Sequence, residues 1–184
     1  MDLAELTLSR RTVHNFKKAK VDNAVVEKAL ELSLWALNHK LTFPWQYFWI
    51  GDVARKKLAE LSVEIKNAKE PLNDVKKKAV TEKITNPSHI ILLGLRRSPD
   101  VLRAHEDYAS LACAVQIASL YLWEQHIGSK WTTGGFSSHA RTYEIMGISP
   151  DEVQLEGALL VGIPLIVPAA TKRPPLERFM QRVE

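Results

Sequence analysis

Apolar residues recur every three to four positions in several stretches of the chain, the spacing that buries one face of a helix. Capping residues bound some of these stretches: Asp22 precedes the second and Gly147 follows the last. The Lys- and Glu-rich residues 69–83 favour a solvated helix or a mobile excursion instead. The predicted helices are residues 1–11, 22–37, 53–68, 106–126 and 140–146.

Runs of β-branched and aromatic residues between turn signals predict the strands. Two of these runs are almost wholly apolar, which is typical of strands buried in the middle of a sheet. The predicted strands are residues 44–50, 89–95, 129–133 and 156–163. Because helices and strands mix without a regular βαβ alternation, we expect an α+β domain with one sheet covered by helices.

The predicted helix 106–126 is apolar or small on nearly every face. Glu106 and Asp107 open it and Gly128 follows its close, in agreement with the helix dipole and with C′ preferences. A helix that is apolar all round is buried all round, and a domain of this size would leave one side of it exposed. We therefore expect a second subunit to cover that side. Cys113, in the middle of this helix, is expected to be a buried structural thiol.

Composition narrows the class of protein. The chain has 184 residues, 46% hydrophobic and 25% charged, which predicts a single globular domain over residues 1–184. One cysteine cannot form an internal disulfide, and the first 16 residues lack the apolar region of a signal peptide. The longest nearly uncharged stretch, residues 108–123, is too short and too polar to span a bilayer. We expect a soluble cytoplasmic protein with no membrane partner.

The charge balance is mildly basic. With 25 basic and 21 acidic residues the formal net charge is +4, and the pI is about 9.2. This excess fits either a nucleic acid or a smaller anionic ligand. No RRM, KH or helix-turn-helix signature supports nucleic-acid binding, so an anionic ligand is the favoured interpretation.

Sequence signatures of catalysis are absent. The chain has no P-loop, no GxGxxG after a strand, no HExxH, no GxSxG and no CxxC. Its six histidines do not fall at metal-ligand spacing, so no metal site is expected. With no catalytic side chain in evidence, any chemistry is expected to belong to a bound cofactor.

Three short segments could bind such a cofactor. In residues 9–16, Arg10, Arg11 and Thr12 offer donors that suit a phosphate, although a basic helix end that favours its own dipole also explains them. Residues 38–45 combine polar groups with Pro and aromatic residues just before a strand. This pattern fits a binding segment, but an ordinary turn also explains it. Residues 130–135 carry glycines and small hydroxyls that let backbone N–H groups approach a planar ligand, or that simply end a strand.

The order of these segments resembles the nitroreductase family of flavin enzymes. The matching residues are RRTVHNF, NHKLTFPWQYFWI, the apolar helix ending in IGSKW, and LLVGIP followed by the basic KRPPLERF. The resemblance extends over essentially the whole chain and is greatest to the short bacterial members described as NAD(P)H nitroreductases. It implies a homodimer with a mainly antiparallel sheet flanked by helices, joined through the apolar helix, with FMN at the dimer interface.

The resemblance also implies roles for single residues. Arg10, Arg11 and Thr12 match the positions that hold the FMN phosphate and ribityl chain, and the basic position of Arg173 lies near the same phosphate. His39 matches a position that reaches the flavin of the other subunit. Trp131, Thr132 and Thr133 match positions that line the isoalloxazine ring. His14 matches the position at the pyrimidine edge of the ring, and Trp35 falls where short members carry a residue that binds the phosphate.

The implied activity is transfer of a hydride from NAD(P)H through flavin N5 to a nitroaromatic, quinone or similar small acceptor, by a ping-pong mechanism. Three positions depart from the family pattern. His14 replaces a cation at the pyrimidine edge, Phe43 replaces a Gln, and Trp35 replaces an Arg. A neutral His14 would lower the flavin potential. These departures leave open a flavin-binding protein that is not a reductase, such as a carrier, a sensor or a flavin-modifying enzyme.

Overall fold

A four-stranded antiparallel sheet forms the middle of the computed structural model, which describes residues 2–183. Its strands are β1 (Trp45–Trp49), β2 (His89–Arg96), β3 (Gly128–Thr132) and β4 (Val153–Gly162). The strand order is β1-β2-β4-β3, so the two apolar runs of the sequence, β2 and β4, lie at the centre. The four predicted strands and the helix-covered sheet are confirmed, although β4 begins three residues before its predicted start.

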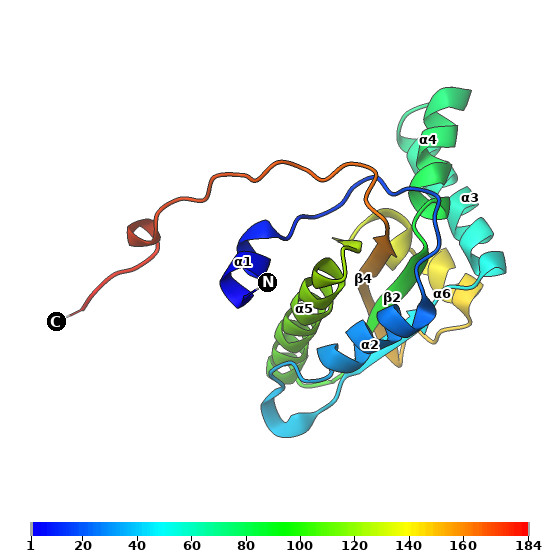
Figure 1. The fold of residues 1–184 in the computed structure, drawn as a ribbon. Helices are drawn as coiled ribbons and strands as arrows, with labels where there is room; N and C mark the ends of the chain where they lie inside the picture. Colours follow the sequence, from blue (N-terminus) through cyan, green and yellow to red (C-terminus); the bar gives the residue numbers. More distant parts are fainter. Residues whose placement is uncertain (1, 184) are drawn as a thin grey trace.

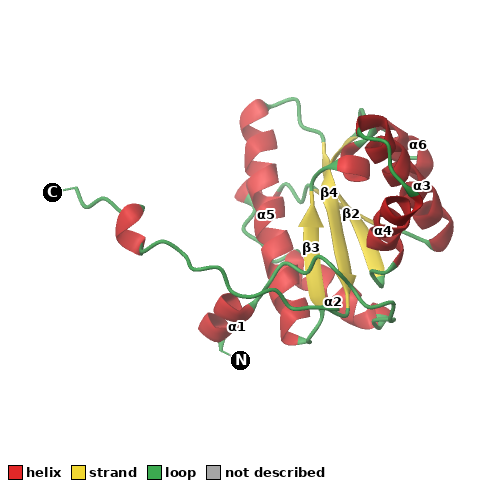
Figure 2. Ribbon diagram, turned by 90° about the horizontal axis from the view of Figure 1, so that it is seen from above, coloured by secondary structure: helices red, strands yellow, loops and turns green. Residues whose placement is uncertain are grey.

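Helices cover both faces of this sheet (Figure 2). Successive residues of β2 point to opposite faces, so Ile91 and Leu93 pack on one side while Ile90 and Leu92 pack on the other. Each fully buried Leu or Ile contributes about 1.5–3 kcal/mol of transfer free energy. One face is covered by α2 (Asn23–Ser33) and α5 (Val101–Glu124), and the other by α3 (Asp52–Lys69), α4 (Asp74–Thr85) and α6 (Ala140–Met146).

Helix α5 is longer at its start than predicted. Asp100 caps it, with its carboxylate accepting hydrogen bonds from the backbone N–H of Leu102 at 2.9 Å and of Arg103 at 3.2 Å. The predicted start at Glu106 was therefore wrong, because the residues of the first turns are exposed to solvent and do not extend the buried apolar pattern. The predicted glycine end was also wrong: Gln125 is the C-cap and Gly128 is the first residue of β3.

The segment before α2 runs along the outer edge of the sheet. Thr12 forms an isolated parallel bridge with Ser129 of β3, and Phe16 forms an antiparallel bridge with Pro164, just after β4. The backbone N–H of Val13 donates to the carbonyl of Ser129 at 3.0 Å. These contacts hold the N-terminal segment beside both β3 and the chain that follows β4.

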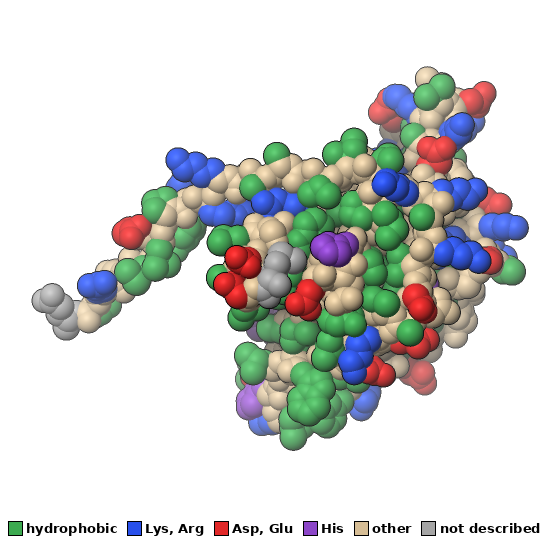
Figure 3. Space-filling model, viewed as in Figure 1, with side chains coloured by type: hydrophobic (Ala, Val, Ile, Leu, Met, Phe, Trp, Pro, Cys, Tyr) green, Lys and Arg blue, Asp and Glu red, His purple; other side chains and the backbone are tan. Residues whose placement is uncertain are grey.

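The outer face of α5 and the C-terminal residues leave apolar groups exposed. Leu102 is 67% exposed and Tyr108 is 40% exposed. Cys113 is exposed too, so the prediction of a buried thiol was wrong: the face of α5 that carries it is not covered within this chain. The C-terminal segment stays beside the N-terminal segment up to Leu165, then extends away from the body as far as residue 183 and carries further exposed apolar side chains (Figures 1 and 3).

Within residues 2–183, none of the helices is both long enough and apolar enough to pass through a membrane.

Candidate functional site

Three arginines face one cavity at the edge of the sheet. Arg10, Arg11 and Arg173 line a cavity of about 640 Å³, within the range of small-molecule sites. The rest of its wall consists of Thr7, Leu8, Thr12, His14, Gln116 and residues 168–171, and none of the described residues that line it is acidic. The cavity is therefore suited to an anion.

Local contacts of α1 (Leu3–Ser9) fix the position of Arg10 and Arg11. A capping box between Asp2 and Glu5 closes the start of α1. At its other end, the indole Nε1 of Trp123 on α5 donates a hydrogen bond to Ser9 Oγ at 3.1 Å. The chain then passes directly from α1 to its bridge with β3, so the two arginines follow a helix end that is tied to α5.

Arg10 and Arg11 differ in how their guanidinium groups are used. Arg11 donates to the carbonyls of Leu8 at 2.6 Å and of Arg10 at 2.8 Å, as expected of a basic residue closing a helix end. Arg10 is different, because its Nε is buried and has no hydrogen-bond partner among the described residues. Burial, with Arg11 and Arg173 nearby, lowers the pKa of Arg10.

An arginine stays protonated despite such a shift, so Arg10 keeps a charge that nothing in the described chain neutralises. A phosphate is a good match, since it accepts paired hydrogen bonds from the planar guanidinium group. The donor set therefore fits the phosphate of a nucleotide cofactor such as FMN.

A second cavity, which we call the lysine cavity, lies between the sheet and helices α3 and α4. It has a volume of about 170 Å³ and is lined by Lys66 of α3, Lys83 of α4 and Lys130 of β3. Thr132, Gly134 and Gly135, at the end of β3, also line it. Backbone at a glycine turn is open to a planar ligand, since no Cβ blocks the approach.

A smaller cavity of about 160 Å³ lies between these two. It shares His14 with the arginine cavity and Lys83 with the lysine cavity. The three cavities thus follow one another along the protein surface. They run from a cluster of arginines to a cluster of lysines.

The loop before β1 has unusual backbone geometry. Lys40, Leu41 and Phe43 have φ values of 58°, 50° and 44°, a region that side chains other than glycine adopt rarely. Each such residue is expected to cost about 1–3 kcal/mol, and strain of this kind is found at functional sites. His39 begins this strained loop, and its Nδ1 lies 2.9 Å from Oε2 of Glu106 on α5.

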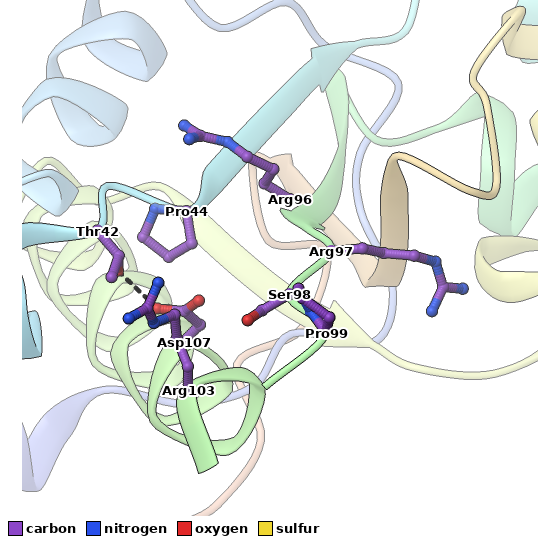
Figure 4. A pocket seen from close by; sticks show the side chains of 8 residues that line it. All are labelled: Thr42, Pro44, Arg96, Arg97, Ser98, Pro99, Arg103 and Asp107. Carbon is purple, nitrogen blue, oxygen red and sulfur yellow. Dashed lines mark hydrogen bonds between the residues drawn. The ribbon is translucent and has the colours of Figure 1, made fainter. Parts of the chain in front are cut away.

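A hydrogen-bond network holds the loop in this conformation. Asn38 accepts a bond from the backbone N–H of Phe43 at 2.9 Å and donates to Thr42 Oγ1 at 2.9 Å. Thr42 in turn donates to Oδ1 of the buried Asp107 at 2.6 Å. Figure 4 shows this last bond at the wall of a separate cavity of about 210 Å³, where Arg103 lies beside Thr42 and Arg97 points away.

The structure brings together part of the predicted site. Of the ten residues, five line the arginine cavity: Arg10, Arg11, Thr12, His14 and Arg173. Thr132 lines the lysine cavity, but its neighbour Trp131 projects from the opposite face of β3 and packs near Tyr108, with ring centroids 6.3 Å apart. Thr133 is exposed in the turn after β3.

Trp35 and His39 lie outside the three cavities. Trp35, in the turn after α2, is 86% exposed. His39 lies in the strained loop at the start of α5, whereas α1 is tied to the far end of that helix. Within one chain these two residues do not join the arginine cavity, so their predicted roles need a second chain.

Sequence reasoning missed the three lysines. Lys83 belongs to a charged run that was interpreted as solvated surface, and Lys66 lies in an ordinary amphipathic helix. Lys130 did carry a signal, because lysine is depleted in strands and this one lies in a short strand that leads into Gly134 and Gly135. Which face it takes could not be known without the register of the sheet.

Comparison with known proteins agrees with the fold. Residues 7–163 match the model of the "Nitroreductase family". The chain is similar to the "Putative NAD(P)H nitroreductase YfhC" of Bacillus subtilis, with 23% identity over 182 residues that cover 97% of this chain and 93% of that protein. The chain therefore belongs to the nitroreductase family.

Solved structures share the fold over the full chain. A "Nitroreductase-like Family Protein" from Bacillus cereus has a TM-score of 0.86 and 25% identity, covering 100% of this chain and 97% of that one. A "putative nitroreductase in complex with fmn" from Desulfovibrio desulfuricans has a TM-score of 0.79 and 18% identity, covering 100% of this chain and 98% of that one.

Proposed function

We propose that this protein is an FMN-dependent oxidoreductase that uses NAD(P)H to reduce a nitroaromatic, a quinone or a similar small acceptor. The observation that carries this proposal is the buried Nε of Arg10, which has no partner among the described residues and belongs to a cluster of three arginines at one end of a line of cavities. The name of the Bacillus subtilis relative and the FMN in the Desulfovibrio structure support the choice of cofactor and reductant.

The chain's own residues have distinct tasks in this proposal. Arg10, Arg11 and Arg173 hold the phosphate, with Thr12 beside them, and the lysine cavity receives the ring end. When bound, FMN would supply two-electron redox chemistry that couples oxidation of NAD(P)H to reduction of the acceptor. The protein orients the cofactor, excludes water from one face and adjusts its affinity for electrons.

A homodimer is part of the proposal. The exposed face of α5 carries Leu102, Tyr108, Ala109 and Cys113, which form an apolar surface suited to a second copy. The exposed apolar residues of the C-terminal segment offer a further contact. Pairing two chains would also give His39 and Trp35 a route to the partner's cofactor.

The visible spectrum of the purified protein tests this function. We expect a yellow protein that releases FMN on denaturation and that bleaches under anaerobic conditions when NADH or NADPH is added. A yellow protein that neither nicotinamide bleaches would support the non-reductase alternative. A colourless protein that FMN cannot reconstitute would refute both.

A further inference from the structure

Lys130 occupies an unusual position for a lysine. It lies in the middle of β3, where its register partner on β4 is Leu160, and both residues line the lysine cavity. Its neighbours Ser129 and Gly128 are buried, and Lys130 itself is half-buried. A long charged side chain at such a place could simply extend to water along apolar surface. Its surroundings argue against that explanation.

The charged groups that line the cavity with Lys130 are cations. Lys66 and Lys83 line the same cavity from α3 and α4, and none of its described lining residues is acidic. Among the described ion pairs and hydrogen bonds, none involves the Lys130 ammonium group. Burial, with Lys83 and Lys66 adding to it, lowers the pKa of Lys130. The chain alone thus gives these charges an unfavourable environment, which an anionic ligand would correct.

The position of the cavity indicates which anion. The lysine cavity is the end of the line of cavities opposite the arginines, with Lys83 as the shared residue. If the arginines hold the phosphate of a nucleotide, the rest of that molecule would extend along the line of cavities toward Lys130, past His14 and Lys83. Oxidised FMN has a neutral ring, whereas the ring of the two-electron-reduced form can lose a proton and become an anion.

We propose that Lys130, with Lys83 and Lys66, forms a cationic platform that binds reduced FMN more tightly than oxidised FMN. This inference rests on the proposed function and deepens it. His14 is exposed and lines the arginine cavity and the cavity next to it, so the positive charge at the lysine end of the line of cavities comes from the platform itself.

The test is the midpoint potential of the FMN-loaded protein, measured by dye-equilibrated reductive titration. In Lys130→Met, which keeps the apolar stem but loses the charge, we expect the ratio of oxidised to reduced FMN dissociation constants to fall at least tenfold. For a two-electron couple this is a lowering of about 30 mV. Lys130→Arg retains the charge and should stay closer to the wild-type potential than Lys130→Met does. Lys57→Met, which removes an exposed lysine of α3 outside the cavity, serves as the matched control.

A structural role for Lys130 would change the melting temperature but leave the potential unaltered. FMN bound by Lys130→Met at the wild-type potential would therefore overturn the platform and leave the proposed function intact. If Lys130→Met fails to fold, the midpoint potential of Lys83→Gln is compared with that of the wild type instead, because Lys83 lines the same cavity from α4. A wild-type protein that takes up no FMN would instead overturn the proposed function itself.

Discussion

Thr42 Oγ1 donates a 2.6 Å hydrogen bond to Oδ1 of Asp107, a residue 65 positions further along the chain. Asp107 is only 4% exposed, so this bond joins the strained loop before β1 to a buried carboxylate of α5. The bond counterbalances part of the backbone strain at Lys40, Leu41 and Phe43, and so fixes where His39 is presented.

Replacing Thr42 should therefore destabilise the protein. Thr42→Val keeps the shape but removes the donor, and we expect a loss of about 1.5–3 kcal/mol, the range for a hydrogen bond to a charged group. Urea unfolding measures this loss, and Thr42→Ser should recover most of it. Thr81→Val removes a hydroxyl of α4 that only back-bonds to Lys77, and should change stability by no more than about 0.5 kcal/mol. Equal unfolding midpoints for Thr42→Val and wild type would show that the bond contributes nothing.

Arg10 should dominate binding of the cofactor phosphate. Because its Nε is buried without a described partner, Arg10→Ala is expected to weaken FMN binding by about 1.5–3 kcal/mol, or roughly 10- to 150-fold. Arg11→Ala should have a smaller effect, since part of its guanidinium already serves the helix end. Quenching of flavin fluorescence gives both affinities, with Arg103→Ala in the separate cavity as control. Unchanged FMN affinity in Arg10→Ala would remove Arg10 from the site.

His89 should make stability depend on pH. Burial, with Arg55 nearby, lowers the pKa of His89, whereas in the unfolded chain it titrates near its usual value of about 6.5. Between these two values the unfolded chain binds a proton that the folded protein does not. The contribution of His89 is thus complete above about pH 6.5 and is lost as the pH falls toward the folded pKa.

The slope from this one group reaches at most about 1.4 kcal/mol per pH unit. His89→Gln does not titrate and can still contact Asn23, whose Oδ1 lies 3.0 Å from His89 Nε2. Chemical unfolding between pH 7.5 and 5.5 should therefore show a weaker pH dependence in the variant. Parallel curves for the two proteins would contradict this assignment.

The exposed face of α5 should control assembly. Ala109→Glu places a carboxylate on this face, and burying it unpaired at a dimer interface costs several kcal/mol. We expect sedimentation equilibrium to show two chains per particle for the wild type and mainly single chains for Ala109→Glu, with weakened FMN binding. Ala68→Glu, on the exposed side of α3, should leave assembly unaffected. A wild-type protein with one chain per particle would refute the dimer.

Much of the fold could be predicted from local patterns. The apolar run of β2 is wholly buried up to Leu95, and α6 ends where Gly147 adopts a φ of 64°. Such features depend on the spacing of apolar residues and on the residues at turns, both of which can be recognised within a single segment of the sequence. The start of α5 was missed because its first turns are solvated, so no apolar signal marks them.

The candidate site was predicted less completely because it depends on how segments meet. Arg10, Arg11 and Arg173 were grouped through the family resemblance, since 162 positions separate Arg11 from Arg173 in the sequence. Cys113 was placed in the core because its neighbours are apolar, but exposure depends on which face of α5 is covered. Lys130 could be recognised only once the register of β3 showed that it shares a cavity with Lys66 and Lys83.

The cluster of Arg10, Arg11 and Arg173 also has a practical consequence for biochemistry on this protein. A cavity that suits the phosphate of a nucleotide equally suits free phosphate or sulfate, so buffer anions would compete with the cofactor during purification. Ammonium sulfate or phosphate buffer would then promote loss of FMN and yield a pale preparation from an intact protein. Reconstitution in a buffer of low anion content would restore the colour, because the competing ions have been diluted away from Arg10.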